Sequence, residues 1–598
     1  METLTESSFV HPRTPSKTLE EVLHLGISCH RQGSIAAAQS LYQQVLLQDR
    51  NNLIALELLI LTYSAQRNFS AALECCDRAL ELDRSKASVH HKKGCCLQEL
   101  ERFQAALASF DEAVRCDPNC SDFYKDRAAA RLGYQLPLLA KKDYLRVIEM
   151  CPDDAETYNA LGLLCNELGS GDEAIAYLEK AISVNPTSIE ATHNLGNILH
   201  SLKRHDQALD AFDKVLALDN SFEPSLRKRG DVLVKLKRPF EAIQSFKKAI
   251  AICPDSHISH NNLGAALHAL GDLEGAVSAY DTAISLYPNY PRAMWNKALV
   301  KLLWGNFTEG WALHEWRLQT EGRDEPLPLP NKPDWRGEED ISDKRLFIPS
   351  EQGLGDLIQF SRYAAMAVEK AGEVILEVPK MLVPVIRTLH PEITLSIKGQ
   401  KPPEFDVYCP VMSLPYAFRT TLETIPTNGK YLSSDGQKVS LWQEALGPTD
   451  KKRVGLVWSG SPKHENDHNR SIPLTELVPL LSDSVEWHSL QKEYRETDLA
   501  VLESMPQVSQ HQDALVDFSD TAALIECLDL VITVDTSVAH LAGALGKPVW
   551  IMLPHVPDYR WLTDRDDSPW YDSVRLYRQQ TSGDWSSVTD QIASDLNS

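Results

Sequence analysis

Residues 153–186 read DDAETYNALGLLCNELGSGDEAIAYLEKAISVNP, and this 34-residue unit recurs along the first half of the chain. Each copy has one slot for a residue that is nearly always small, and alanine or glycine twelve residues later. An aromatic residue often follows four residues after that, and proline often closes the unit. The slots hold Gly26, Ile60, Gly94, Ala128, Gly162, Gly196, Gly230, Gly264 and Ala298; Ala38, Ala72, Ala106, Ala140, Ala174, Ala208, Ala242, Ala276 and Gly310; the aromatics Tyr42, Phe110, Tyr144, Phe212, Phe246 and Tyr280; and the prolines Pro118, Pro152, Pro186, Pro254 and Pro288.

This pattern predicts pairs of antiparallel helices. Small side chains let two helices approach closely, the aromatic fills the space between them, and proline ends the second helix because it cannot continue the hydrogen-bond ladder. One such hairpin cannot bury its apolar face alone, so neighbours must stack. The pattern resembles the tetratricopeptide repeat, which implies an all-α superhelix with an inner groove for extended peptides. We expect nine repeats over residues 18–320, after a flexible tail of residues 1–17.

Asparagines recur in the slot two residues before the glycine, at Asn194, Asn262 and Asn296. We expect them to line the groove and to hydrogen-bond the backbone of a bound protein or peptide. The series is interrupted in other repeats, for example by Lys92 and Lys228. The alternative, that these are solvated polar positions on an exposed face, stays open.

Composition narrows the classes of partner. The net charge of −23 over 598 residues argues against binding to nucleic acid or to anionic lipid. The first twenty residues have no apolar run, and no stretch is long and apolar enough to span a membrane, so we expect a cytoplasmic protein. The twelve cysteines form no C-x-x-C pair, which favours buried thiols in a reducing compartment over a zinc site.

Periodicity stops near residue 320, and the pattern then changes to apolar runs that alternate with helices. We expect a linker over 321–343 and two α/β lobes, over 344–435 and 450–598, whose parallel strands end at a shared cleft. The fold class is therefore a helical repeat array followed by two Rossmann-like lobes.

Three segments of the cleft carry candidate site residues. The first contains Gln352, Gly353, Gly355 and Asp356 at a strand-to-helix turn; the aspartate is either a functional carboxylate or simply the N-cap of the helix. The second is a polar loop with Ser459, Gly460, Lys463 and Arg470, whose two cations could neutralise a pyrophosphate. The third is Asp535, Thr536, Ser537 and His540, where a helix start offers backbone N–H groups to a phosphate.

Together these segments resemble glycosyltransferase family 9, the heptosyltransferase-like enzymes of GT-B fold. The resemblance implies that Asp356 is the catalytic base, that Asp535, Thr536, His540 and Leu541 match the motif that holds the nucleotide diphosphate, and that Lys463 is the basic residue of the donor loop. The combination with repeats is similar in layout to O-linked N-acetylglucosamine transferase, and Ser489-Leu490-Gln491-Lys492 resembles its donor lobe, which adds Gln491 and Lys492 to the donor-binding set.

The resemblance implies an inverting, metal-independent transfer of sugar from a nucleotide-diphosphate donor to a hydroxyl, on a protein bound by the repeats, with no cofactor. The D-x-D triplet Asp564-Arg565-Asp566 is interpreted as a loop rather than a metal site. Two alternatives stay open: a non-catalytic repeat scaffold with a degenerate nucleotide-binding domain, and a heptosyltransferase-like enzyme that acts on a glycan. The sequence names neither the sugar, the nucleotide, the acceptor nor the oligomeric state.

Overall fold

The computed structural model describes residues 18–320, 331–427, 429–464 and 466–597. The expected tail over 1–17 and residues 321–330 of the expected linker lie outside the described residues. The chain forms two compact units, one up to Leu236 and one from Lys237 onward. The boundary falls inside the helical array, and each unit is described by itself.

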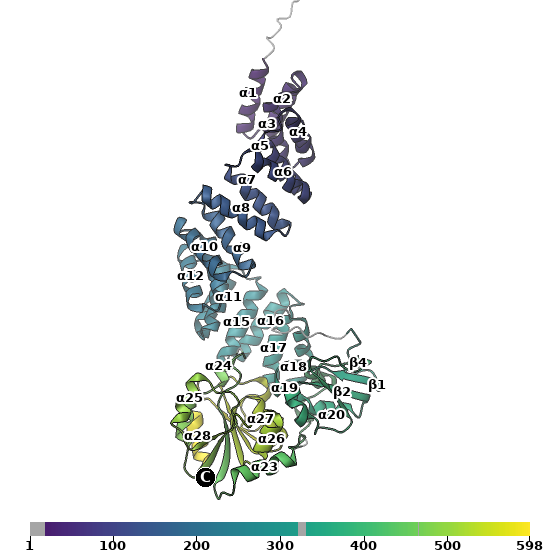
Figure 1. The fold of residues 1–598 in the computed structure, drawn as a ribbon, viewed down its shortest axis with the longest axis vertical. Helices are drawn as coiled ribbons and strands as arrows, with labels where there is room; N and C mark the ends of the chain where they lie inside the picture. The colour runs from purple at the N-terminus through teal and green to yellow at the C-terminus, as the bar shows by residue number, and fades with distance from the viewer. Residues whose placement is uncertain (1–17, 321–330, 428, 465, 598) are drawn as a thin grey trace, which may run out of the picture. The chain divides into compact units, whose positions relative to one another are not determined.

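The first unit is entirely helical (Figure 1). Its helices are α1 (Leu19–Arg31), α2 (Ile35–Gln48), α3 (Leu53–Ala65), α4 (Phe69–Leu82), α5 (Ala87–Glu99), α6 (Phe103–Cys116), α7 (Ser121–Gly133), α8 (Pro137–Met150), α9 (Ala155–Glu167), α10 (Gly171–Val184), α11 (Ile189–Ser201), α12 (His205–Leu218) and α13 (Glu223–Lys235). The alternation of one thirteen- and one fourteen-residue helix through α12 reproduces the period of the sequence.

The glycine slot contacts the aromatic slot of the same repeat. A Cβ placed at Gly94 would lie 2.7 Å from the ring of Phe110, and one at Gly196 would lie 2.6 Å from the ring of Phe212. The second repeat reverses the sizes, because buried Ile60 there accompanies buried Cys76 in the aromatic position. In these repeats the ring occupies the space that a Cβ at the glycine would need, whereas the fourth repeat accommodates Ala128 with Tyr144.

The second unit begins with the remaining helices of the array: α14 (Pro239–Ile252), α15 (His257–Leu270), α16 (Leu273–Leu286), α17 (Pro291–Leu303), α18 (Phe307–His314) and the 3₁₀ turn η1 (Glu315–Gln319). One apolar core continues from these helices into the domain that follows. Trp311, which is 2% exposed, makes edge contacts with Phe360 and Tyr559, with ring centroids 6.0 and 5.9 Å away. Trp304, by contrast, is 37% exposed.

Two parallel sheets follow. The first has the order β3-β2-β1-β4, from β1 (Ile341–Ile348), β2 (Ala371–Val378), β3 (Ile393–Ile397) and β4 (Val407–Tyr408). The second has the order β10-β9-β8-β5-β6-β7, from β5 (Lys452–Val457), β6 (Val485–Ser489), β7 (Val508–Gln510), β8 (Leu530–Val534), β9 (Val549–Leu553) and β10 (Val574–Arg578). All pairings between these strands are parallel, for example Phe347 with Ile375 and Leu456 with Ile532. Strand β1 starts three residues before the expected position 344.

Helices cover both faces of the six-stranded sheet (Figure 1). In the second lobe they are α24 (Asp467–Arg470), η5 (Leu474–Leu480), α25 (Glu496–Glu503), α26 (Phe518–Glu526), α27 (Ser537–Ala544), η6 (Tyr559–Trp561) and α28 (Ser586–Leu596). The first lobe has α19 (Leu354–Phe360), α20 (Arg362–Ala367), η2 (Lys380–Leu382), α21 (Val383–Ile386), η3 (Val411–Ser413), α22 (Leu414–Ala417) and η4 (Leu422–Thr424). Between the lobes, α23 (Gly436–Leu446) packs against α26 of the second lobe.

Each sheet reverses its winding direction next to its first strand, between β1 and β4 and between β5 and β8. This is the doubly wound, Rossmann-like arrangement, in which ligands bind beyond the carboxyl ends of the strands at the reversal. The expected fold class, a helical repeat array followed by two α/β lobes, is confirmed.

Candidate functional site

A cavity of about 2070 Å³ lies within the second unit, between the last repeats and the two α/β lobes. Its lobe walls are the loops that follow β1, β5, β6, β8 and β9, which is where the reversal points of the two sheets place a ligand. The sequence-predicted residues that line it are Gln352, Gly353, Gly355, Asp356, Ser459, Gly460, Lys463, Arg470, Gln491, Lys492, Asp535, Thr536, Ser537 and His540, with Asn262 and Asn296 from the repeats. Asn194 belongs to the first unit.

The loop after β1 brings Asp356 to the first turn of α19. Gly353 is the N-cap, and one carboxylate oxygen of Asp356 accepts a hydrogen bond of 2.8 Å from the Gly353 N–H. The alternative that Asp356 is the N-cap is therefore wrong, because it occupies the third helical position and caps backward in the manner of a capping box. Gln352 before it has a left-handed φ of 58°.

Gly355 lets the two lobes meet. A Cβ at this position would lie 2.8 Å from Cδ2 of His540 and 3.5 Å from Cα of Ser537, so α19 of the first lobe packs directly on α27 of the second. A side chain here would push the two helices apart. The glycine therefore fixes the distance between Asp356 and the helix start expected to hold a diphosphate.

The second oxygen of Asp356 pairs with Arg560, a residue that the sequence analysis missed. Arg560 is 8% exposed and also donates to Asp558 at 2.6 Å and to the side-chain oxygen of Gln359 at 2.8 Å. Burial raises the pKa of the Asp356 carboxyl, and the guanidinium of Arg560 opposes that shift. The sequence signal that could have pointed to Arg560 is its position as a basic residue in the loop after the buried strand β9.

The loop after β5 is held from the neighbouring strand. The Gln491 side chain accepts from the Ser459 N–H at 3.3 Å and donates to the Ser459 carbonyl at 3.1 Å. The Ser459 hydroxyl is buried, and within the part of the chain that the structure describes it has no hydrogen-bond partner. Gln491 thus positions the loop, and the hydroxyl remains available on the cavity wall.

The predicted cations differ in their surroundings. Arg470 packs against Gly460 and donates to the Asp535 carbonyl at 3.2 Å. Lys463 is exposed at the cavity rim, and Lys492 donates to the Gln512 carbonyl at 2.8 Å. Arg470 is therefore the predicted cation that the structure holds against the Asp535 segment.

The segment after β8 forms the floor of the second lobe. Thr536 is the N-cap of α27, and the first N–H groups of a helix have no partner within the helix, so Thr536 and Ser537 offer donors to an anion. Burial and the charge of Asp558 raise the pKa of Asp535 to about 6, against the lowering effect of Arg560.

His540 lies one turn further along α27 and is 4% exposed. Its Nδ1 is 3.0 Å from the Tyr571 hydroxyl, its Nε2 is 3.9 Å from an Asp535 oxygen, and its ring stacks on Trp561. Burial, reinforced by nearby arginines such as Arg560, lowers its pKa far below the usual value, so the ring is neutral.

The last repeats supply the remaining wall of the cavity. Asn296 donates to Asn261 at 3.0 Å, and Asn261 donates to Asn262 at 3.0 Å. In the first unit, Asn194 donates in the same way to Asn159 of the preceding repeat, also at 3.0 Å. The asparagines thus pair between neighbouring repeats, which fixes the orientation of their amides.

A buried ion pair ties the end of the array to the site. Arg317 of η1 has no exposed surface, and its Nε donates at 3.1 Å to Glu351, which immediately precedes the Asp356 loop. The same guanidinium donates to Ser413 at 2.8 Å and to Glu315 at 2.8 Å. The last repeat is therefore packed as part of the same unit as the α/β lobes.

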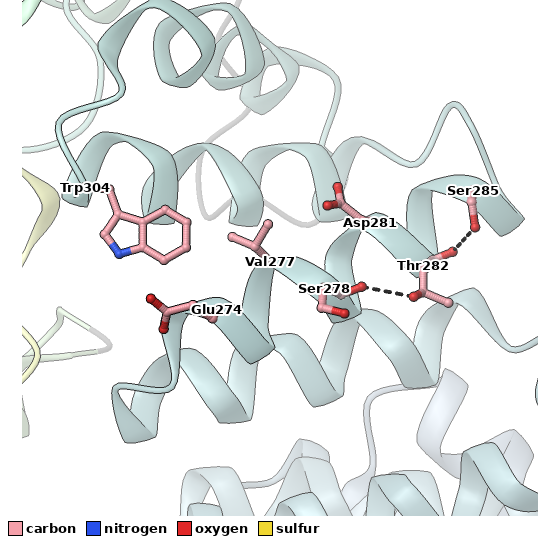
Figure 2. Close-up of a pocket in the computed structure, with 7 residues that line it drawn as sticks. All are labelled: Glu274, Val277, Ser278, Asp281, Thr282, Ser285 and Trp304. Carbon is pink, nitrogen blue, oxygen red and sulfur yellow. Dashed lines mark hydrogen bonds between the residues drawn. The ribbon is translucent and has the colours of Figure 1, made fainter.

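A second, shallower pocket of about 580 Å³ lies on α16, where Glu274, Ser278, Asp281 and Thr282 share one face with Trp304 nearby (Figure 2). The Thr282 hydroxyl bonds the Ser278 carbonyl at 2.9 Å, and Asp281 pairs with Lys297 at 2.8 Å. Thr282 and Asp281 are therefore already partnered within the repeats. The larger cavity is the candidate site.

Possible metal ligands gather elsewhere. Among the described residues, groups of three with ligand atoms close together occur in the first unit, at His90, Glu112 and Cys116 and at His91, Cys95 and Asp126. In the second group His91 and Asp126 already form an ion pair. Neither group contributes to the cavity.

Comparison with known proteins supports both halves of this architecture. Tetratricopeptide-repeat families match residues 26–87, 87–120, 153–221, 230–271 and 257–290, and glycosyltransferase family 9 (heptosyltransferase) matches residues 508–552. Protein FlbA of Caulobacter vibrioides is 24% identical over 550 residues, which cover 87% of this chain and 85% of FlbA. Human RNA polymerase II-associated protein 3 is 27% identical over 112 residues, 19% of this chain and 17% of that protein.

Solved structures match the repeats only in part. The C-terminal part of a repeat-containing protein from Cytophaga hutchinsonii is 18% identical and covers 40% of this chain and 97% of its own, with a TM-score of 0.36. MamA from Desulfovibrio magneticus is 23% identical, and the match covers 28% of this chain and 92% of MamA, with a TM-score of 0.25. The chain thus carries tetratricopeptide repeats in its N-terminal region and, toward its C-terminus, a segment that matches glycosyltransferase family 9. Within the described residues, no helix has the length and apolarity needed to cross a membrane.

Proposed function

We propose that this protein is a glycosyltransferase that moves a sugar from a nucleotide-diphosphate donor to a hydroxyl of a protein held by the repeats. The observation that carries the proposal is the single cavity in which Asp356 of the first lobe meets the Thr536-Ser537 helix start of the second. The family 9 match at residues 508–552 includes that helix start.

The chemistry proposed is a direct displacement. The acceptor oxygen attacks the anomeric carbon, the bond from that carbon to the diphosphate oxygen breaks, and the nucleoside diphosphate leaves with the bonding electrons. Asp356 accepts the proton of the acceptor hydroxyl. Attack from the side opposite the leaving group inverts the anomeric configuration.

The developing charge on the diphosphate needs positive partners. The free N–H groups at the start of α27 and the guanidinium of Arg470 supply them, with Lys463 at the rim. These groups support a metal-independent reaction. His540 would act as a neutral hydrogen-bonding group and support for α27.

The repeats are proposed to present the acceptor. Asn261, Asn262 and Asn296 line the same cavity as Asp356, so a peptide held by these amides would reach the carboxylate. All twelve cysteines are unpaired, which supports a reducing compartment, and we propose a cytoplasmic location.

A second candidate, a non-catalytic scaffold, is favoured by one observation: Asp356 is held by Arg560 rather than being free. The two functions separate in one experiment. The full chain is incubated with UDP-, GDP-, ADP- and CMP-linked sugars and a proteome extract or a glycan mixture, and release of the nucleotide product is measured with and without EDTA.

Release that needs added protein and survives EDTA supports the proposal, and NMR of the product reports the anomeric configuration. Release with glycans alone would indicate a heptosyltransferase-like acceptor class. Binding of donor without any release would indicate the scaffold.

A further inference from the structure

Arg560 is the centre of the interface between the two lobes. Its guanidinium has three separate acceptors, each on a different nitrogen: Asp356 and Gln359 on α19 of the first lobe, and Asp558 in its own loop. The side chain lines the cavity beside Asp535 and His540, whose pKa values both respond to its charge. One cation thus lies between the proposed base and the proposed diphosphate site.

The pairing with Asp356 conflicts with that residue's role as a base. One carboxylate oxygen of Asp356 is bonded to the guanidinium of Arg560 and the other to the Gly353 N–H, so both oxygens are engaged although burial raises the pKa of the carboxyl. Asp356 would therefore be a poor proton acceptor in the arrangement observed. Something must take the guanidinium away before transfer.

The donor carries the group suited to do this. A diphosphate presents several anionic oxygens and binds arginine in a fork geometry, so it competes well against a single carboxylate. Arg560 has two further anchors, Asp558 and Gln359, which would hold it at the interface when it leaves Asp356. Asp356 in turn keeps its bond from the Gly353 N–H.

We propose that Arg560 couples donor binding to release of the base: the diphosphate of the nucleotide sugar takes the guanidinium of Arg560, and Asp356 is thereby freed to accept a proton. This inference rests on the proposed function. The transfer step stays balanced, since the proton moves from the acceptor hydroxyl to Asp356 and the electron pair of the broken bond leaves with the nucleoside diphosphate. Without donor, Asp356 is masked, and binding is ordered with donor first.

Calorimetry on the full chain tests the coupling, with inorganic pyrophosphate, UDP, GDP, ADP and CDP as probes. Arg560→Gln should weaken binding of the best probe by about 10- to 100-fold, because a charge-assisted contact is lost. The affinity of Arg560→Lys should lie between those of the wild type and Arg560→Gln. Arg565→Gln is the matched control, because Arg565 pairs locally with Asp567 and is absent from the cavity lining. Melting temperatures show whether each variant is folded.

The decisive measurement is a double-mutant cycle. Asp356→Asn removes the carboxylate that competes for Arg560, so it should tighten probe binding several-fold in the wild-type background and have no effect in Arg560→Gln. If Asp356→Asn tightens probe binding as much in Arg560→Gln as in the wild type, the effect is simple charge repulsion and the coupling is overturned. Unchanged probe affinity in Arg560→Gln itself would also overturn it. Failure of the wild-type chain to bind any probe would remove the proposed function and this inference together.

Discussion

At the scale of single residues, the two carboxylate oxygens of Asp356 have different partners. One oxygen caps α19 and the other faces Arg560. Asp356→Asn keeps an acceptor for the Gly353 N–H but cannot take a proton at neutral pH. We therefore expect sugar transfer to fall by about 10²- to 10⁴-fold while the protein stays folded.

Transfer rate and melting temperature, measured together, check this expectation. Asp356→Ala is the matched variant, since it loses the capping bond as well and should cost roughly 1 kcal/mol more in stability. An Asn variant with the wild-type rate would show that Asp356 is only a capping residue.

Asp535 gives a prediction about pH. Its folded-state pKa of about 6 lies above the ordinary value of 3.8, mainly because burial and Asp558 disfavour its charge. The raised pKa means that ionised Asp535 destabilises the fold above pH 6, and that this cost disappears as the pH falls below about 4. Arg470, Arg560 and neutral His540 are the other ionisable groups around it.

Asp535→Asn should therefore raise the free energy of unfolding at pH 8, by up to about 3 kcal/mol, and change it little at pH 4. Urea unfolding at both pH values measures this. Asp529→Asn serves as a comparison, because the Asp529 carboxylate accepts a hydrogen bond of 2.8 Å from the backbone N–H of Arg453, at the start of β5. Equal effects of Asp535→Asn at the two pH values would contradict the assignment.

At the scale of elements, the packing of α19 on α27 depends on one glycine. A Cβ at Gly355 would meet His540 at 2.8 Å, and the ring cannot retreat because it is stacked on Trp561 and bonded to Tyr571. Gly355→Val should separate the helices and cost about 1–3 kcal/mol, the usual range for overpacking.

Thermal unfolding and probe affinity measure that separation. Gly436→Val, at the exposed start of α23 where a Cβ meets nothing, is the control. If Gly355→Val binds pyrophosphate as the wild type does, the α19–α27 contact does not shape the anion site.

The same scale shows what the sequence could predict. The repeats were predictable because their signal is local: a glycine and the ring that fills its space are sixteen residues apart in one hairpin, as in Gly94 and Phe110. The two lobes were predictable from apolar runs, since these runs form parallel strands, most of them buried, such as β8. The Asp356–Arg560 pair was not, because its partners are 204 residues apart and meet only when two lobes dock. The pairing of Asp356 with Arg560 is a tertiary property.

At the scale of the whole molecule, the array divides between two units. The boundary falls after Leu236, so α14 to α18 fold with the α/β lobes. A fragment spanning 237–598 should melt cooperatively and keep slow hydrolysis of the donor, but lose transfer to proteins that need the earlier repeats. Circular dichroism and nucleotide release measure both properties.

A fragment that starts at residue 321 should fail, although it contains both sheets. It lacks Trp311 and Arg317, and leaves Glu351 without its buried partner beside the Asp356 loop. Breaking such a pair costs about 3–5 kcal/mol, a large share of the stability of a domain. Arg317→Ala in the full chain isolates this contribution, and Arg115→Ala, which removes an exposed pair with Glu112, controls for loss of an arginine. If the 321–598 fragment melts as sharply and as high as 237–598, the last repeats are accessories to the lobes; if it does not, they are part of the domain that builds the site.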